Sequence, residues 1–113
     1  MPYRVRITDA ALADARDYVR FVRDVKKEPA AAERWYRGLL EAVFLLEQLP
    51  SRCPLIPEAT HFPAELRHLI FHSHRIIFLS DPAETTVDIL RIYHGSRRRL
   101  ISADVKWEGG KSD

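Results

Sequence analysis

The sequence is poor in cysteine and glycine and has no long apolar run. Cys53 is the only cysteine among 113 residues, so no disulfide can form within the chain, which fits a reducing cytoplasm. The four glycines form no phosphate-binding loop. No apolar stretch approaches the length of a membrane span, and arginines stand where a signal peptide would need apolar residues. We therefore expect a cytoplasmic protein that does not enter the membrane.

The composition is that of one folded domain with an uneven charge distribution. A hydrophobic content of 46% can fill a core, so residues 1–113 are expected to form a single domain, with a flexible tail from about residue 101. The formal net charge is only +2, yet the range from Ile89 to Ile101 holds four arginines and no acid. A local cationic patch can attract polyanions even when the whole molecule is nearly neutral.

The first fifty residues predict a strand followed by two helices. The range 3–7 alternates apolar and basic side chains, which is typical of a half-buried strand, and Thr8 or Asp9 can cap the helix that follows. A second helix is expected between Pro29 and Pro50. Two amphipathic helices joined by a short polar loop should form an antiparallel hairpin. The predicted apolar stripes comprise Leu12, Ala15, Tyr18, Val19, Val22 and Val25 in the first helix, and Ala32, Trp35, Leu39, Ala42, Leu46 and Leu49 in the second.

Gly38 lies in the middle of the second predicted helix. Glycine costs roughly 1 kcal/mol relative to alanine in a helix, so its presence predicts that another backbone packs close to it. Residues 50–65 then carry four prolines and predict a stiff connector over the surface, anchored by Leu55, Ile56 and Phe62.

The second half of the chain predicts three strands. They span residues 66–72, 75–79 and 86–94, with tight turns at Ser73–His74 and at residues 80–85. Loops this short imply an antiparallel meander. The predicted fold class is α+β: an N-terminal strand, an antiparallel helical hairpin and a three-stranded antiparallel meander, with the hairpin packed on one sheet.

Arginines are the first candidates for a functional site. Arg67, Arg75 and Arg91 lie on three strands that should be neighbours, and Arg97 follows the last strand after Gly95. The planar guanidinium binds phosphate through two parallel hydrogen bonds, so arginines converging on one face could stabilise a phosphorane-like transition state. The alternative is that these side chains face solvent and discourage edge pairing, as charged residues on small domains usually do.

Histidines are the second candidates. Histidine titrates near neutrality, so His94 and Tyr93 could move the protons of metal-free RNA cleavage, although adjacent strand residues point to opposite faces unless the strand bulges. The alternative is a plain hydrogen bond at the end of the strand. His68, His72 and His74 suggest metal ligands, but His74 is expected in a turn, Cys53 is far along the sequence and no acid stands at a telling spacing, so we expect no metal site and no cofactor. Cys53 beside a proline is expected to be a packed core residue.

The order of elements and one long stretch of sequence resemble a known family. The stretch "HRIIFLSDPAETTVDILRIYHGSRR" combines a strand led by arginine, a short acidic turn, a V-x-I-L-R-I strand and H-G-x-R. Together with the helix exit "LLEQLPSRCPLIPEA", it resembles the RelE/ParE superfamily of type II toxin–antitoxin toxins over roughly residues 3–99. The resemblance implies a cytoplasmic, plasmid-stabilisation type toxin that is neutralised by a cognate antitoxin with a flexible segment.

The two branches of the superfamily imply different targets. RelE-like toxins cut mRNA on the ribosome without metal, whereas ParE-like toxins inhibit DNA gyrase. The RelE branch would give phosphate contacts to Arg75 and Arg97, with His94 as acid or base and Arg67 or His68 as a less direct match. A tyrosine that this branch often uses has no counterpart, since Ala103 stands near its place.

The missing tyrosine and the long helical hairpin favour the ParE branch, in which enzymatic activity is not expected. A member that only binds its antitoxin is a further alternative. The candidates for target or phosphate binding are Arg67, Arg91, Tyr93, Arg98 and Arg99.

Overall fold

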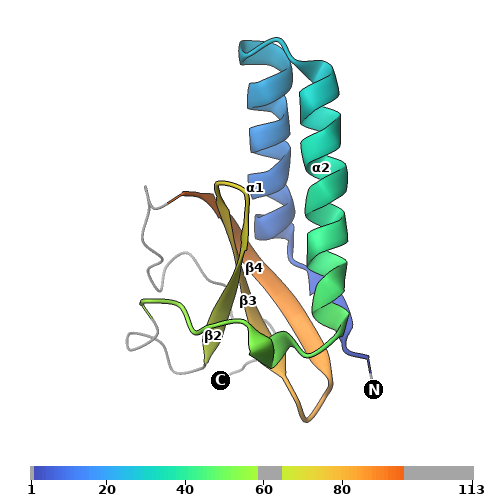
Figure 1. Cartoon of the computed structure of the whole chain (residues 1–113), viewed down its shortest axis with the longest axis vertical. Helices are drawn as coiled ribbons and strands as arrows, with labels where there is room; N and C mark the ends of the chain where they lie inside the picture. The colour runs from blue at the N-terminus through green and yellow to red at the C-terminus, as the bar shows by residue number, and fades with distance from the viewer. Residues whose placement is uncertain (1, 59–64, 96–113) are drawn as a thin grey trace.

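The computed structural model describes residues 2–58 and 65–95 of the chain (Figure 1). The predicted order of strand, two helices and three strands is confirmed. Phe62 and the tail from about residue 101 lie outside the described residues. The elements are β1 (Arg4–Ile7), α1 (Asp9–Arg20), a π-helical turn (Phe21–Val25), α2 (Pro29–Phe44), two 3-10 turns (Leu45–Glu47 and Pro50–Arg52), β2 (Leu66–Phe71), β3 (His74–Asp81) and β4 (Thr86–His94).

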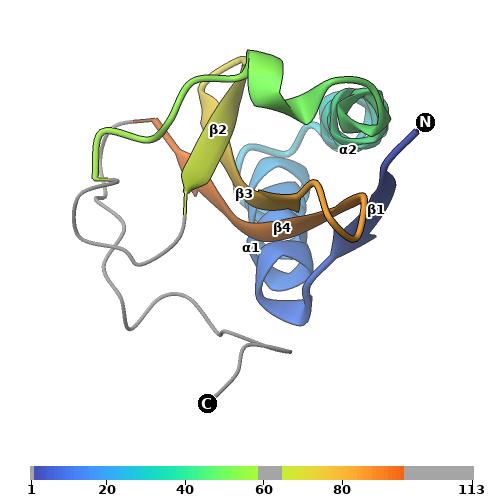
Figure 2. The same cartoon turned by 90° about the horizontal axis from the view of Figure 1, so that it is seen from below.

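The strands form one mixed sheet in the order β1-β4-β3-β2. β2, β3 and β4 make the predicted antiparallel meander, and β1 lies parallel to β4 at the edge. The helical hairpin covers one face of this twisted sheet (Figure 2), which confirms the predicted α+β class. The predicted turn at Ser73–His74 is wrong by one residue, because Phe71 pairs with His74 and the loop is His72–Ser73. His72 takes up the left-handed conformation there, with φ of 53°.

Two hydrophobic clusters lie on the two faces of the sheet. The larger one fills the space between the hairpin and the sheet, as the predicted stripes require. The smaller one lies on the far face under the connector, where Ile56 is buried as expected. The buried members of the first are Ala11, Ala15, Leu39, Val43, Leu46, Cys53, Ile76, Phe78, Val87, Ile89 and Ile92, and those of the second are Ile56, Leu66, Ile77, Leu90 and Tyr93.

Three residues expected in the core are exposed. Val25 is 66% exposed, because the π-helical turn at the end of α1 shifts the register of its apolar stripe. Leu49 is 71% exposed, because the chain tightens into a 3-10 turn after Phe44 and Leu49 itself is left-handed. Leu55 is 44% exposed, because it pairs with Arg67 in an isolated β-bridge and neighbouring Ile56 takes the inward position.

The close neighbour of Gly38 is a ring and not a backbone. A Cβ atom at Gly38 would lie 3.1 Å from Cζ of Phe71, which packs against the helix-side core from the end of β2. The predicted close approach therefore exists, but β2 supplies it through a side chain.

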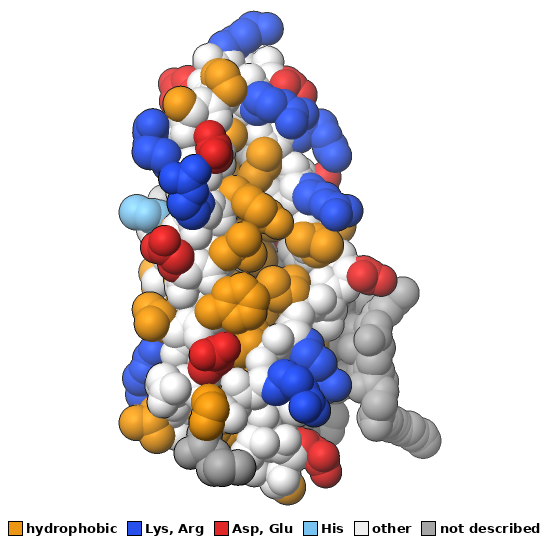
Figure 3. All heavy atoms as spheres, turned by 90° about the vertical axis from the view of Figure 1, so that its right-hand side faces the viewer, with side chains coloured by type: hydrophobic (Ala, Val, Ile, Leu, Met, Phe, Trp, Pro, Cys, Tyr) orange, Lys and Arg blue, Asp and Glu red, His pale blue; other side chains and the backbone are white. Residues whose placement is uncertain are grey.

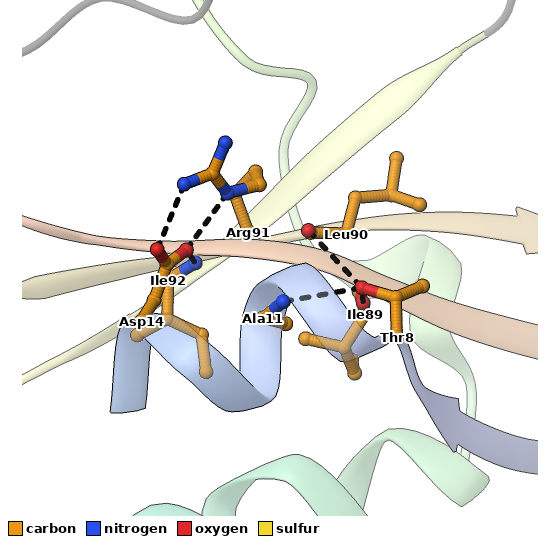
Figure 4. Close-up of polar contacts among 7 residues, drawn as sticks. All are labelled: Thr8, Ala11, Asp14, Ile89, Leu90, Arg91 and Ile92. Atoms are coloured by element: carbon orange, nitrogen blue, oxygen red, sulfur yellow. Dashed lines mark hydrogen bonds and ion pairs between the residues drawn. The ribbon is translucent and has the colours of Figure 1, made fainter. Parts of the chain in front are cut away.

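Thr8 joins the start of α1 to β4. Its Oγ1 accepts a hydrogen bond from the amide of Ala11 at 3.2 Å, so Thr8 is the cap of the helix as predicted. The same hydroxyl donates to the carbonyl of Ile89 at 2.7 Å (Figure 4). One side chain therefore both caps α1 and ties the start of that helix to β4.

His74 is a polar residue inside the helix-side layer. It is 3% exposed, and its ring lies 4.4 Å from that of Tyr18 and 4.9 Å from that of Trp35, measured between centroids. In the described part of the chain its Nδ1 has no hydrogen-bond partner. Burial, and then the neighbouring His94 and His72, lower the pKa of His74 to about 4.

The buried His74 predicts a loss of stability in acid. Between about pH 6.5 and pH 4 the unfolded chain binds a proton that the native imidazole does not. The free energy of unfolding should therefore decrease as the pH is lowered through this window, by up to about 3 kcal/mol. Chemical denaturation at several pH values measures this. His74→Phe should flatten the profile, whereas His72→Asn, in the exposed turn, should keep it. An unchanged slope in His74→Phe would contradict the assignment.

Candidate functional site

Arg75 is the centre of a polar cluster on the sheet face away from the hairpin. It pairs with Tyr93 of β4, so the two side chains share this face. Its guanidinium holds the carboxylate of Glu58 through two hydrogen bonds, Nη2 to Oε1 at 2.8 Å and Nη1 to Oε2 at 3.1 Å. Both partners are buried, Glu58 to 2% exposure. The cationic fork of Arg75 is therefore occupied by an anion from the same chain.

His68 extends the cluster towards β2. Arg75 donates through Nε to Nδ1 of His68 at 3.3 Å. Burial lowers the pKa of His68, and the positive charge of Arg75 lowers it further while Glu58 opposes this. The imidazole is therefore held neutral as a hydrogen-bond acceptor.

Arg91 reaches the sheet face away from the hairpin through an irregularity in β4. The register shifts at Ile77, so that both Leu90 and Arg91 stand against one residue of β3. Asp14 of α1 holds the guanidinium at 2.8 Å from both Nε and Nη2 and also accepts the amide of Ile92 at 2.9 Å (Figure 4). Cζ of Arg91 lies 4.9 Å from the ring centroid of Tyr93.

The expected convergence of Arg67 with the other strand arginines is wrong. Arg67 stands opposite Phe78, whose side chain belongs to the helix-side core, whereas Arg75 and Tyr93 face the other way. Its Nη1 donates to the carbonyl of Cys53 at 2.6 Å. Arg67 therefore ties β2 to the connector.

His94 does not join the polar cluster around Arg75. His94 faces the hairpin, with its ring 5.8 Å from that of Tyr18, so it lies on the opposite face from Arg75 and Tyr93. Cys53 is buried as expected, and burial raises the pKa of its thiol. The positions of Arg97, Arg98 and Arg99 lie outside the described residues.

Sequence reasoning missed the two carboxylates that organise the site. Asp14 lies 77 positions from Arg91 and Glu58 lies 17 positions from Arg75. Asp14 gives one weak signal, because it lies four residues before Tyr18 of the apolar stripe and so on the same side of the helix, where a charged residue requires a partner. Glu58 gives none, since it follows an irregular proline-rich segment.

A cavity of about 670 Å³ lies between α1 and the ends of β3 and β4. Its walls combine aromatic rings with charged groups of both signs. Tyr18, Phe21 and His94 supply rings, and the further lining residues are Asp14, Asp17, Lys26, His74, Arg91, Ile92 and Tyr93.

A second hollow of about 520 Å³ runs along the groove between the two helices. Figure 3 shows an apolar stripe along this face with Lys and Arg side chains on either side. The hollow is lined by Arg16, Val19, Arg20, Arg23, Pro29, Ala32, Glu33 and Tyr36. The bottom of the groove is therefore apolar, and the side that α1 and its π-helical turn form is mainly cationic.

In residues 2–58 and 65–95, no three His, Cys, Asp or Glu side chains are grouped so that they could hold a metal ion. No helix of the described part is both long and apolar enough to cross a membrane.

The buried ion pair predicts a strong effect of removing one partner. Glu58→Gln leaves the buried guanidinium of Arg75 uncompensated and should lower the free energy of unfolding by about 3 kcal/mol. Glu33→Gln, in the exposed pair with Arg37, should cost no more than about 0.5 kcal/mol. Urea denaturation compares the variants, and the double variant Glu58→Leu with Arg75→Met should recover most of the loss. Equal effects of Glu58→Gln and Glu33→Gln would contradict this account.

Comparisons with known proteins agree with this architecture. The family described as ParE toxin of the type II toxin–antitoxin system, parDE, matches residues 5–99. No curated protein matches the chain significantly. Among solved structures, the chain is similar to one from the chromosomal ParDE toxin–antitoxin system of P. aeruginosa, with 22% identity, a TM-score of 0.64, and coverage of 83% of this chain and 97% of that one.

Two RelE-type structures are similar as well. The RelBE toxin–antitoxin complex from Mycobacterium tuberculosis gives 27% identity and a TM-score of 0.57, covering 83% of this chain and 99% of that one. The archaeal RelE–RelB complex from Pyrococcus horikoshii gives 20% identity and a TM-score of 0.55, covering 87% and 100%. The match to the family over residues 5–99 spans most of the sequence, and the chain belongs to the ParE toxin family of type II toxin–antitoxin systems, within the RelE/ParE superfamily.

Proposed function

We propose that this toxin arrests growth by binding and inhibiting DNA gyrase, and that it does not cleave RNA. The observation that carries the proposal is the pair formed by Arg75 and Glu58. A phosphate clamp needs an accessible guanidinium, but the side chain of Arg75 is 11% exposed and already holds a carboxylate in the two-pronged geometry that a phosphate would use. Displacing Glu58 would leave a buried carboxylate without its partner.

The position of His94 supports the same proposal. A general acid or base must lie within hydrogen-bond reach of the group whose proton it moves. His94 faces Tyr18 on the hairpin side, and Arg75 faces the opposite side of the sheet. A single substrate phosphate held at Arg75 would therefore be separated from His94 by the sheet.

Ribosome-dependent RNA cleavage is the second candidate, and one observation favours it. Arg75, His68 and Tyr93 share one face, and Arg91 lies over the ring of Tyr93. This group contains a cation, a neutral imidazole and a phenol, which are groups that acid–base catalysis can use. In this alternative Arg97 would supply the phosphate contact and Glu58 would have to withdraw.

A cognate antitoxin is the proposed partner of the groove between α1 and α2. The solved relatives come from ParDE and RelBE systems, in which the toxin has an antitoxin partner. The groove has apolar residues along its length, and it is lined by Arg16 and Arg20 of α1 and by Arg23 of the π-helical turn. An acidic, amphipathic segment that becomes ordered on binding fits this chemistry.

Gyrase inhibition is tested with the purified toxin. It should block supercoiling by gyrase at near-stoichiometric ratio while translated mRNA in the same extract stays intact. Replacing Arg98 and Arg99 together by alanine should weaken the block, because the cations are proposed to contact the target. Arg4→Ala, an exposed arginine on the edge strand β1, is the matched control.

The contrary outcomes are distinct. Cuts in the A-site codon that vanish in Arg97→Ala would identify the ribosome-dependent nuclease. Unchanged supercoiling together with intact message would identify a member that only binds its antitoxin.

The antitoxin proposal is tested by a charge reversal in the groove. Arg16→Glu should weaken the complex with the small protein encoded by the adjacent reading frame by about tenfold, because a lining cation is replaced by an anion that repels an acidic segment. Arg34→Glu, exposed on α2 and not part of the lining, should have little effect. Titration calorimetry measures both, and equal affinities for the two variants would remove the groove as the docking surface.

A further inference from the structure

We infer that the cavity between α1 and the ends of β3 and β4 is a binding site for an uncharged, planar aromatic small molecule that carries a hydrogen-bond acceptor. The cavity of about 670 Å³ falls within the range of sites that hold small organic ligands, about 300–1,000 Å³. A single aromatic side chain of a protein partner would leave most of this volume empty, so the volume favours a free compound of several fused rings. The inference goes beyond gyrase inhibition and does not depend on it.

Rings from four elements of the fold line the cavity. The ring of Tyr18 in α1 lies nearly parallel to that of His94 in β4, with 20° between the planes and 5.8 Å between the centroids. Phe21 of the π-helical turn lies 6.2 Å from Tyr18, and His74 of β3 lies 4.9 Å from His94, also between centroids. Flat rings attract further flat rings in offset-stacked or edge-to-face arrangements, so these walls favour a planar ligand.

The position of Phe21 comes from an irregularity of the helix. Phe21 is 46% exposed and begins the π-helical turn that runs to Val25, directly after the last regular turn of α1. Such turns are rare and are found mostly at functional sites. In this chain the turn brings an exposed aromatic ring and Lys26 to the same cavity.

The formal charges of the lining acids, lysine and arginine balance. Asp14 and Asp17 contribute two negative charges, and Lys26 and Arg91 contribute two positive ones. Asp14 and Arg91 are partly buried and hold each other at 2.8 Å, so they act as one neutral unit. Among the described residues the cavity therefore has no net charge to offset the cost of removing an ion from water, which favours an uncharged ligand.

Polar groups distinguish the cavity from a plain apolar hollow. Lys26 is exposed, and its ammonium group can donate a hydrogen bond to a carbonyl oxygen of the ligand. His74 is buried in the lining, and burial, followed by its histidine neighbours, lowers its pKa to about 4, so this imidazole is neutral near pH 7. A cavity with aromatic walls, a few polar groups and a titratable residue of perturbed pKa is the usual form of a small-molecule site.

The test is the binding of Nile red to the full chain, measured by fluorescence titration. Nile red is an uncharged, planar fused-ring dye with a carbonyl acceptor, and Nile blue is a cation with the same ring skeleton. The wild-type protein should bind one molecule of Nile red, about tenfold more tightly than Nile blue, because the described lining has no net charge to offset that of the cation.

Substitutions in the lining should change this binding. Phe21→Ala should weaken the binding of Nile red about tenfold, because it removes an exposed ring, whereas Phe21→Trp keeps a flat ring and should retain the affinity. Phe44→Ala is the matched control, since Phe44 is 45% exposed but lies at the end of α2, outside the lining. Lys26→Met removes the donor and leaves the lining negative, so the preference for Nile red over Nile blue should shrink, whereas Lys27→Met, outside the lining, should keep it.

NMR locates the dye in the wild-type protein. The amide signals of Phe21 and Ile92 should shift on addition of Nile red, whereas those of Ala32 and Glu33 in the groove between the helices should not. Shifts centred on that groove, equal loss of affinity in Phe21→Ala and Phe44→Ala, tighter binding of Nile blue than of Nile red, or no saturable binding by the wild-type protein would each overturn the inference.

Discussion

Among residues 2–58 and 65–95, no strand lies beside the second half of β4 on its outer edge, and much of the described structure is arranged around this constraint. β1 pairs with β4 only from Thr86 to Ile89. Beyond that point the edge amides and carbonyls need other partners, because unpaired backbone groups are costly and invite pairing with other chains. Thr8 and Asp14 of the α1 region supply them, through the carbonyls of Ile89 and Leu90 and the amide of Ile92 (Figure 4).

The same arrangement decides what the strand arginines can do. Each of the three is held by an oxygen of the chain itself: Arg91 by Asp14, Arg75 by Glu58 and Arg67 by the carbonyl of Cys53. A row of arginines in a sequence suggests a phosphate-binding surface, but guanidinium groups that are partly buried and paired contribute mainly to the geometry of the fold. The held arginines therefore favour recognition by surfaces that remain accessible over catalysis by these guanidinium groups.

The local patterns in the sequence predicted most of the fold. Alternation in residues 3–7 and the three- to four-residue spacing in the helices identified β1, α1 and α2, since both signals come from burial of one face. Errors arose where the helical register changes, at the π-helical turn that exposes Val25 and at the left-handed Leu49. Neither change leaves a mark in the apolar spacing. The parallel pairing of β1 with β4 also has no local signal, because it depends on how the hairpin returns the chain to the sheet.

The candidate site was harder to predict than the fold, because its contacts join residues that lie far apart in the sequence. A strand arginine can be recognised from sequence, but its face depends on the register and its availability depends on a carboxylate far along the chain. The irregularity near Leu90 and the π-helical turn at Phe21 are both departures from regular structure, and both redirect side chains at the same end of β4. The helical segment that begins with α1 therefore has two roles: the first turns of α1 close the edge of β4, and the π-helical turn after α1 brings Phe21 and Lys26 to the cavity beside that edge.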